Sequence, residues 1–215
     1  MLEKFQEEYK NLESDLNELA GTLESRLQAT RLALVNNDAV LADKIYHGDS
    51  VINEAIKRCM EEDMNLSMLQ EPVARDWRNL MATLKILSDL ERIADHCADI
   101  SYYILVMDKE GSKMPLPSHL LEMYDIMTSM VKEVLNGYFR QEPFDQKAVK
   151  DKDDIVDALF HKQLKEFAEE IRKAPDRALD YLFFTMIVKY IERMADHSDN
   201  VAEWIGYRDT NKITL

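Results

Sequence analysis

Apolar residues recur three or four positions apart along most of the chain, which is the spacing that places them on one face of an α-helix. The clearest run forms a single stripe near the N-terminus: Phe5, Tyr9, Leu12, Leu16, Leu19, Leu23 and Leu27. Such a stripe is typical of a long helix that packs in a coiled-coil-like bundle. Asn36-Asn37-Asp38 is expected to end this helix and to offer a capping side chain to a second helix that starts near Ala39.

Glycine and proline mark the other helix ends, because both residues are costly inside a helix. The chain has five of each among 215 residues, far below the ordinary usage of roughly 7% and 5%, so few turns are expected. Pro72 is expected to open a third helix that ends near Asp108, and the segment 111–118 is the clearest break in the chain. Three further helices are expected over about 118–140, 145–173 and 175–207.

The sequence therefore predicts an all-α fold built as two tandem, similar three-helix bundles, residues 1–110 and 118–215, joined by a linker at 111–117. A motif near the end of each half supports the repeat, because Leu90-Glu91-Arg92-Ile93-Ala94-Asp95-His96 recurs as Ile191-Glu192-Arg193-Met194-Ala195-Asp196-His197. A weaker pair lies in the second and fifth helices, where Asp49-Ser-Val-Ile-Asn53 resembles Asp153-Asp-Ile-Val-Asp157. These matches indicate a duplicated three-helix unit.

Each half carries carboxylates at helical spacing, and residues four apart lie on one face of a helix. If the helices of each half are antiparallel neighbours, the two weaker motifs approach the two stronger ones. The expected oxygen ligands are Glu91, Asp95, Asp99, Asp49 and Asn53 in the first half and Glu192, Asp196, Asn200, Asp153 and Asp157 in the second. Hard oxygen ligands suit Mg²⁺, Mn²⁺, Fe or Ca²⁺. The sequence thus predicts two metal sites.

An ordinary solvated surface is the alternative to a metal site. With 41 acidic residues, carboxylates four apart arise several times by chance, and Arg92 and Arg193 could pair with them on the surface. The duplication favours the metal site, because the same pattern stands in both halves. His96 and His197 lie about 100° around the helix from the neighbouring aspartates, so packing or a supporting role is expected for them rather than ligation.

Charge and motif content exclude several classes of function. The net charge of −14 argues against nucleic acid and anionic lipid as direct partners. Free phosphate is not expected to bind directly unless a cation first reverses the local charge. No apolar run reaches the length of a membrane span and the N-terminus does not resemble a signal peptide, so a cytoplasmic location is expected. No histidine has a glutamate three residues before it, and no phosphate-binding glycine loop or nucleophile elbow occurs, so no enzymatic activity is expected.

The order of these motifs, together with Gln70-Glu71-Pro72-Val73-Ala74-Arg75-Asp76-Trp77-Arg78 between them, resembles the PhoU family of phosphate-transport regulators. The resemblance implies metal binding, by iron (Fe), Mg, Mn or Zn ions, at Glu91, Asp95, Glu192 and Asp196, and less directly at the residues of the two weaker motifs. The family often has glycine at the positions of Ala94 and Ala195 and asparagine at that of Asp99.

The same resemblance implies a regulatory function. PhoU-type proteins restrain phosphate uptake and phosphate-starvation signalling by contacting the ATPase subunit of the phosphate transporter and a phosphate-sensing histidine kinase. A homodimer is a further expectation, because the first helix is amphipathic and the chain has twelve methionines available to fill a core or an interface. The alternative is a metal-independent acidic helical scaffold that binds basic partner surfaces.

Overall fold

A computed structural model describes residues 2–69, 74–140 and 142–210, and within these ranges every regular element is a helix. The elements follow the order α1 (Leu2–Asn36), α2 (Ala39–His47), α3 (Asp49–Leu69), α4 (Ala74–Lys109), α5 (Leu120–Phe139), α6 (Gln146–Lys173), η1 (Pro175–Arg177) and α7 (Ala178–Thr210). The predicted all-α fold is confirmed. The predicted helix opening at Pro72 lies outside the described residues.

The first half differs from the prediction at its second helix, which is divided into α2 and α3 at Gly48. The Gly48 amide donates to the carbonyl of Lys44 at 2.9 Å. A Cβ atom at this position would lie 2.7 Å from the same oxygen, so only glycine permits the approach. The interruption places Asp49 in the first turn of α3, where the helix dipole favours a negative charge.

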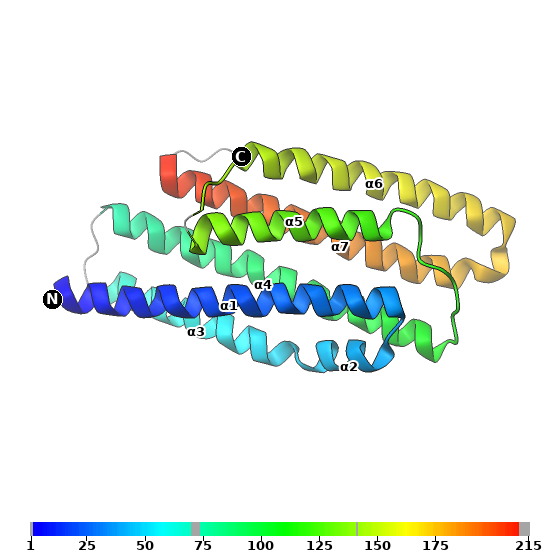
Figure 1. The fold of residues 1–215 in the computed structure, drawn as a ribbon, viewed down its shortest axis with the longest axis horizontal. Coiled ribbons are helices and arrows are strands. Elements are labelled where there is room, and N and C mark those ends of the chain that lie inside the picture. Colours follow the sequence, from blue (N-terminus) through cyan, green and yellow to red (C-terminus); the bar gives the residue numbers. More distant parts are fainter. Residues whose placement is uncertain (1, 70–73, 141, 211–215) are drawn as a thin grey trace.

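The helices run along the long axis of an elongated bundle, and the linker after α4 carries the chain to α5 (Figure 1). Helices α4 and α7 lie side by side and form the most extensive contact between any two elements. Helices α1 and α5 also touch, so the two halves meet along two pairs of helices. The division at residues 111–117 stays a prediction, because the halves are in close contact over much of their length.

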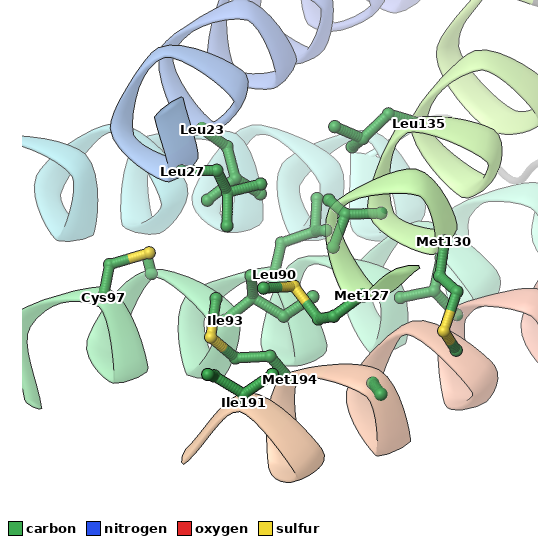
Figure 2. Packing of buried hydrophobic residues seen from close by; sticks show 14 of the residues in the cluster. Leu23, Leu27, Leu90, Ile93, Cys97, Met127, Met130, Leu135, Ile191 and Met194 are labelled. Atoms are coloured by element: carbon green, nitrogen blue, oxygen red, sulfur yellow. The ribbon is translucent and has the colours of Figure 1, made fainter. Parts of the chain in front are cut away.

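One continuous apolar core runs through both halves and receives side chains from each of the helices α1 to α7 in the described ranges. Figure 2 shows its centre, where Leu23 and Leu27 of α1 lie above Ile93 of α4, with Met127 of α5 and Met194 of α7 alongside. Burying apolar surface from both halves in one cluster stabilises the halves against each other as well as internally. None of the helices in the described ranges combines the length and the apolarity that a membrane span requires.

Candidate metal centre

The repeated motif follows the division between core and rim on each of the two central helices. On α4, Leu90, Ile93 and Ala94 are fully buried, whereas Glu91 and Asp95 remain partly exposed. On α7, Ile191, Met194 and Ala195 take the buried positions, and Figure 2 shows Leu90, Ile93, Ile191 and Met194 in the packed interior. Because the apolar positions hold each helix against the core, the carboxylates lie on the outer edge of that helix.

Three carboxylates of the second half lie close enough together to share a cation. Asp157 of α6 and Glu192 and Asp196 of α7 each offer an oxygen, and these atoms lie within 4.8 Å of one another. We call these three residues the C-terminal acidic cluster. Divalent ions bind oxygen ligands at about 2.0–2.6 Å, so two ligands of one ion lie at most about 5 Å apart. The spacing of the cluster fits that requirement.

The charge balance of the C-terminal acidic cluster also favours a cation. Asp196 is exposed on the outer edge of α7, but partial desolvation of its carboxyl group is the largest cause that raises its pKa to about 6, and the charges of Glu192, Asp153 and Asp157 raise it further. Lys189 opposes this effect, since its Nζ lies 2.7 Å from Glu192 Oε2. Two lysines, Lys189 beside Glu192 and Lys150 beside Asp153, therefore face four carboxylates, and the repulsion that remains is what a bound divalent cation would remove.

Asp153 stands beside this cluster with an unused oxygen. Its residue is 4% exposed, and its Oδ2 accepts a hydrogen bond from Lys150 Nζ at 3.0 Å. Its Oδ1 is buried and has no hydrogen-bond partner within the described part of the chain. Burial raises the pKa of Asp153. An unpartnered buried carboxylate oxygen is costly, so a bound cation at this edge would satisfy a group that the protein leaves open.

The corresponding residues of the first half meet differently. Asp49 and Asn53 of α3 approach Asp95 of α4, because Asn53 Nδ2 donates to Asp49 Oδ2 at 2.8 Å and to Asp95 Oδ1 at 3.5 Å. Arg26 of α1 already supplies the opposite charge, since its Nη2 lies 2.5 Å from Asp49 Oδ1. Burial raises the pKa of Asp49 and Arg26 lowers it. We call Asp49, Asn53 and Asp95 the N-terminal polar group.

The guanidinium group of Arg26 therefore makes the first half less suited to binding a metal ion than the second half. Among the described residues, the C-terminal acidic cluster is the one place where three carboxylate, histidine or cysteine ligands come within 4.8 Å of one another. In the first half, Asn53 Oδ1 is buried without a hydrogen-bond partner in the described ranges, so one neutral oxygen ligand remains available there. Glu91 lies on the same edge of α4, one turn before Asp95, and is partly exposed.

Two predicted ligands have hydrogen-bond partners outside these clusters. Asp99 Oδ2 lies 3.0 Å from Nδ1 of His96, which is 5% exposed. Asn200 donates to Asp89 of the first half at 3.4 Å, and Asp89 also lies 2.9 Å from Nδ1 of His197. The two histidine rings are 5.7 Å apart between α4 and α7. The structure thus gathers Asp99 and Asn200 at the contact between the halves.

Several residues of these sites escaped the sequence analysis. Lys150 and Lys189 each stand three residues before a predicted ligand and pair with it, so helical spacing could have found them. Lys150 also reaches Asp199 on the neighbouring helix α7 at 3.0 Å. Arg26 and Asp89 lie on other helices than the groups they contact. No periodic signal connects them to those groups, because their contacts depend on helix packing.

The fold and these sites define a class of protein: an elongated all-helical bundle built from a repeated unit, with carboxylates on the outer edge of each half. Comparison with known proteins agrees with that class. The sequence matches the PhoU domain twice, over residues 16–104 and 120–205. The chain belongs to the PhoU family.

Relatives and solved structures extend this result over nearly the whole chain. The chain is 27% identical to a phosphate-specific transport system accessory protein PhoU homolog of Rhizobium meliloti, covering 98% of this chain and 89% of that protein. It is 28% identical to the homolog of the same name in Clostridium acetobutylicum, with 97% and 95% covered. The crystal structure of PhoU from Pseudomonas aeruginosa superposes with a TM-score of 0.90 at 25% identity, covering 97% of this chain and 100% of that one.

Proposed function

We propose that this chain is an accessory protein of a phosphate-specific transport system, and that metal bound at its acidic edge is part of how it regulates that system. Membership of the PhoU family and the printed names of its relatives support the transport role. The observation that carries the metal-binding part is the approach of Asp157, Glu192 and Asp196 to within 4.8 Å of one another. The protein acts as a regulator and not as an enzyme.

The C-terminal acidic cluster would hold the ion, with the open oxygen of Asp153 beside it as a further ligand. Iron, Mg²⁺, Mn²⁺ and Zn²⁺ all accept carboxylate oxygens as ligands. Desolvation raises the pKa of Asp196 to about 6 and the repulsion from Glu192, Asp153 and Asp157 adds to it, and a bound cation would relieve that repulsion. The N-terminal polar group would bind an ion more weakly, because Arg26 competes for Asp49.

The regulatory step follows from a change in surface charge. The protein carries a net charge of −14, and a bound cation makes one edge of the bundle more ordered and less negative. We propose that this edge negatively regulates phosphate uptake and phosphate-starvation signalling by contacting the transporter's ATPase subunit and its sensor histidine kinase. These contacts would take place in the cytoplasm, with the protein as a homodimer.

The test is the metal content of purified, untagged protein, measured by elemental analysis, for the wild type and for a Glu192→Gln/Asp196→Asn variant. We expect the wild type to bind metal at this cluster. The variant should bind at least about tenfold more weakly, because two of three charged ligands become neutral. Binding of the ATPase subunit should fall in the same variant and in wild type treated with a chelator.

A matched control uses two acidic residues of the same helix as Asp157 that stand outside the cluster. Asp151→Asn/Asp154→Asn also removes two negative charges, and both residues are exposed. This variant should keep its metal and its partner. If wild type stays metal-free after Mg²⁺, Mn²⁺, Fe²⁺ and Zn²⁺ are offered, and a chelator leaves partner binding unchanged, the metal-independent scaffold replaces this proposal.

A further inference from the structure

A cavity with a volume of about 570 Å³ opens between α1, α4, α5 and α7, and none of the predicted metal ligands lines it. Its walls include the first turns of α4, the C-terminal end of α5 and the C-terminal end of α7. Three guanidinium groups line this cavity: Arg75 and Arg78 from α4 and Arg208 from α7. A cluster of arginines is notable in a chain with 41 acidic residues and 27 basic ones.

Two of these arginines have no carboxylate partner in the described part of the chain. Within the described residues, neither Arg75 nor Arg78 takes part in an ion pair, and the Nε of Arg78 is buried without a hydrogen-bond partner. A buried guanidinium N–H that lacks an acceptor carries a free-energy cost, and an anion in the cavity would remove that cost. Arg208 is already engaged, since its Nε lies 2.7 Å from Asp209 Oδ1 and its guanidinium lies over the Tyr138 ring.

The cavity wall also carries acidic residues. Besides Asp209, which pairs with Arg208, the wall includes Glu13 and Glu142. Burial raises the pKa of Tyr9, and the charge of Glu13 adds to that effect. The pKa of Arg140 is raised chiefly by Glu24, and Glu142 adds to it. The wall thus balances three carboxylates with three guanidinium groups, of which Arg75 and Arg78 form no ion pair with any residue that the structure describes.

The floor of the cavity is polar and ordered. The Thr83 hydroxyl lies 2.6 Å from the Tyr138 hydroxyl and donates to the carbonyl of Asn79 at 2.9 Å. Asp63 lies behind this floor and is fully buried, and burial raises its pKa to about 8 while the nearby Thr83 hydroxyl lowers it by less. The raised pKa favours the neutral form of its carboxyl group, which adds less repulsion toward an anion than a carboxylate would.

We propose that this cavity binds a small organic phosphate ester, with Arg75 and Arg78 holding its phosphoryl group. Guanidinium groups present paired N–H donors that match phosphoryl oxygens, and two of them balance a dianion. The volume falls in the range of about 300–1,000 Å³ that small-molecule sites occupy, which is more than a single phosphate ion fills. The rings of Tyr9, Tyr138 and Phe144 line the same space and offer apolar surface to the organic part.

The test is isothermal titration of the full chain in EDTA, which keeps divalent ions away from the acidic clusters. The probes are AMP and glucose 6-phosphate, their uncharged counterparts adenosine and glucose, and inorganic phosphate. We expect at least one ester to bind at least tenfold more tightly than inorganic phosphate and its uncharged counterpart not to bind. Arg78→Gln and Arg75→Gln should each weaken that binding about tenfold or more.

Two controls keep the result tied to the cavity. Arg172→Gln removes the same charge from an exposed position on α6 and should leave binding unchanged. Arg78→Lys keeps the charge but loses the fork of donors, so it should bind less tightly than wild type and more tightly than Arg78→Gln. Circular dichroism melting curves establish that each variant is folded.

Three outcomes would overturn the proposal. In the first, neither ester binds. In the second, an ester binds equally well to wild type and to both glutamine variants. In the third, inorganic phosphate binds as tightly as the esters, and Arg78→Gln abolishes the binding of inorganic phosphate. The last outcome would assign the cavity to free phosphate. The Glu192→Gln/Asp196→Asn variant should keep ester binding in EDTA, so failure at the metal cluster and failure at the cavity are separate results.

Discussion

Asp196 shares the outer edge of α7 with Glu192, and Asp157 approaches both from α6. The pKa of Asp196, about 6, lies well above the ordinary value of 3.8, because partial desolvation and three neighbouring carboxylates disfavour its charged form. The folded protein therefore holds a proton on Asp196 at pH values where the unfolded chain has released it. Protons and metal ions compete for the same oxygens, so this one residue links pH, stability and metal binding.

We expect the metal affinity of the C-terminal acidic cluster to fall about tenfold per pH unit below the pKa of Asp196. In EDTA, the raised pKa of Asp196 makes the free energy of unfolding decrease as pH rises from about 4 to about 6. This pH dependence is opposite to that of a salt-bridged aspartate, whose pKa is lowered by folding. Asp196→Asn should remove this contribution. Mn²⁺ titrations and melting temperatures across this pH range measure both effects, and a wild-type affinity independent of pH would contradict the assignment.

In the first half, the guanidinium group of Arg26 competes with a metal ion for the carboxylate of Asp49. We expect Arg26→Gln to lower the free energy of unfolding by about 1–3 kcal/mol, because a partly buried carboxylate loses its charged partner. Added Mn²⁺ should recover part of this loss by taking the place of the guanidinium. Thermal melting with and without Mn²⁺ is the measurement.

The matched control for this variant is Arg31→Gln. Arg31 pairs with Asp125 at 2.6 Å on a more exposed surface, where such pairs contribute about 0–1 kcal/mol. Its loss should not be reversed by Mn²⁺. An Arg26→Gln variant that is insensitive to Mn²⁺ would mean that the N-terminal polar group does not bind metal even when Asp49 is free.

At the scale of elements, the helix ends depend on single side chains. Asp145 stands just before α6 in an extended conformation, and its Oδ1 accepts from the amides of Lys147 at 3.0 Å and Ala148 at 3.4 Å. These amides have no intrahelical partner, so the side chain satisfies donors that the helix leaves open. Helix α6 carries both Asp153 and Asp157, so its start bears on the candidate metal centre.

Asp145→Ala should lower the free energy of unfolding by about 1 kcal/mol, since it removes the cap of α6. Asp151→Ala is the control, because it removes an acidic side chain one and a half turns later that pairs with Lys147 on the surface. That change should cost about 0.3–0.5 kcal/mol. Urea denaturation measures the free energy of unfolding of both variants. An equal decrease in the two variants would argue against the capping role of Asp145.

Helix boundaries were largely predictable because capping and proline effects are local. The sequence placed a helix over 145–173, and the structure has Asp145 as the cap of a helix from Gln146 to Lys173. The sequence did not predict the break at Gly48. A glycine alone does not require an interruption, and the close approach of its backbone to Lys44 belongs to the turn between α2 and α3.

At the scale of the whole molecule, the two repeats behave structurally as one body. Tyr124 of α5 donates to the carbonyl of Leu27 of α1 at 2.8 Å in the interior, and Arg140 reaches Glu24 at 3.1 Å. These bonds join the first helix of each repeat, while α4 and α7 join the third helices. The apolar core passes through both contacts without a boundary.

We therefore expect calorimetry to find a single unfolding transition for the full chain. Ile191→Ala, which opens a cavity at a fully buried position of α7, should lower that transition as a whole and cost about 2–5 kcal/mol. Two separate transitions, with only one of them shifted by Ile191→Ala, would mean that the halves unfold independently. The exposed Ile155 of α6 provides the control, since Ile155→Ala should cost much less.

The sequence by itself determined the helices, the repeat and the edges on which the carboxylates stand. All three follow from local geometry, because residues four apart share a helix face wherever the helix lies. It was also sufficient to place Glu192 beside Asp196 and Asp49 beside Asn53. The resemblance to the PhoU family was confirmed by the two matches to its domain.

Only the tertiary structure decided which of these edges meet and what charge they meet. Asp157 joins Glu192 and Asp196, while Arg26 comes from another helix to Asp49, so two similar motifs have different electrostatic surroundings. Asp99 contacts His96 and Asn200 contacts Asp89 where the halves meet, and Arg75 and Arg78 line a cavity with α1, α5 and α7. These relations join residues far apart in the chain. They depend on how whole helices pack, which helical periodicity does not specify.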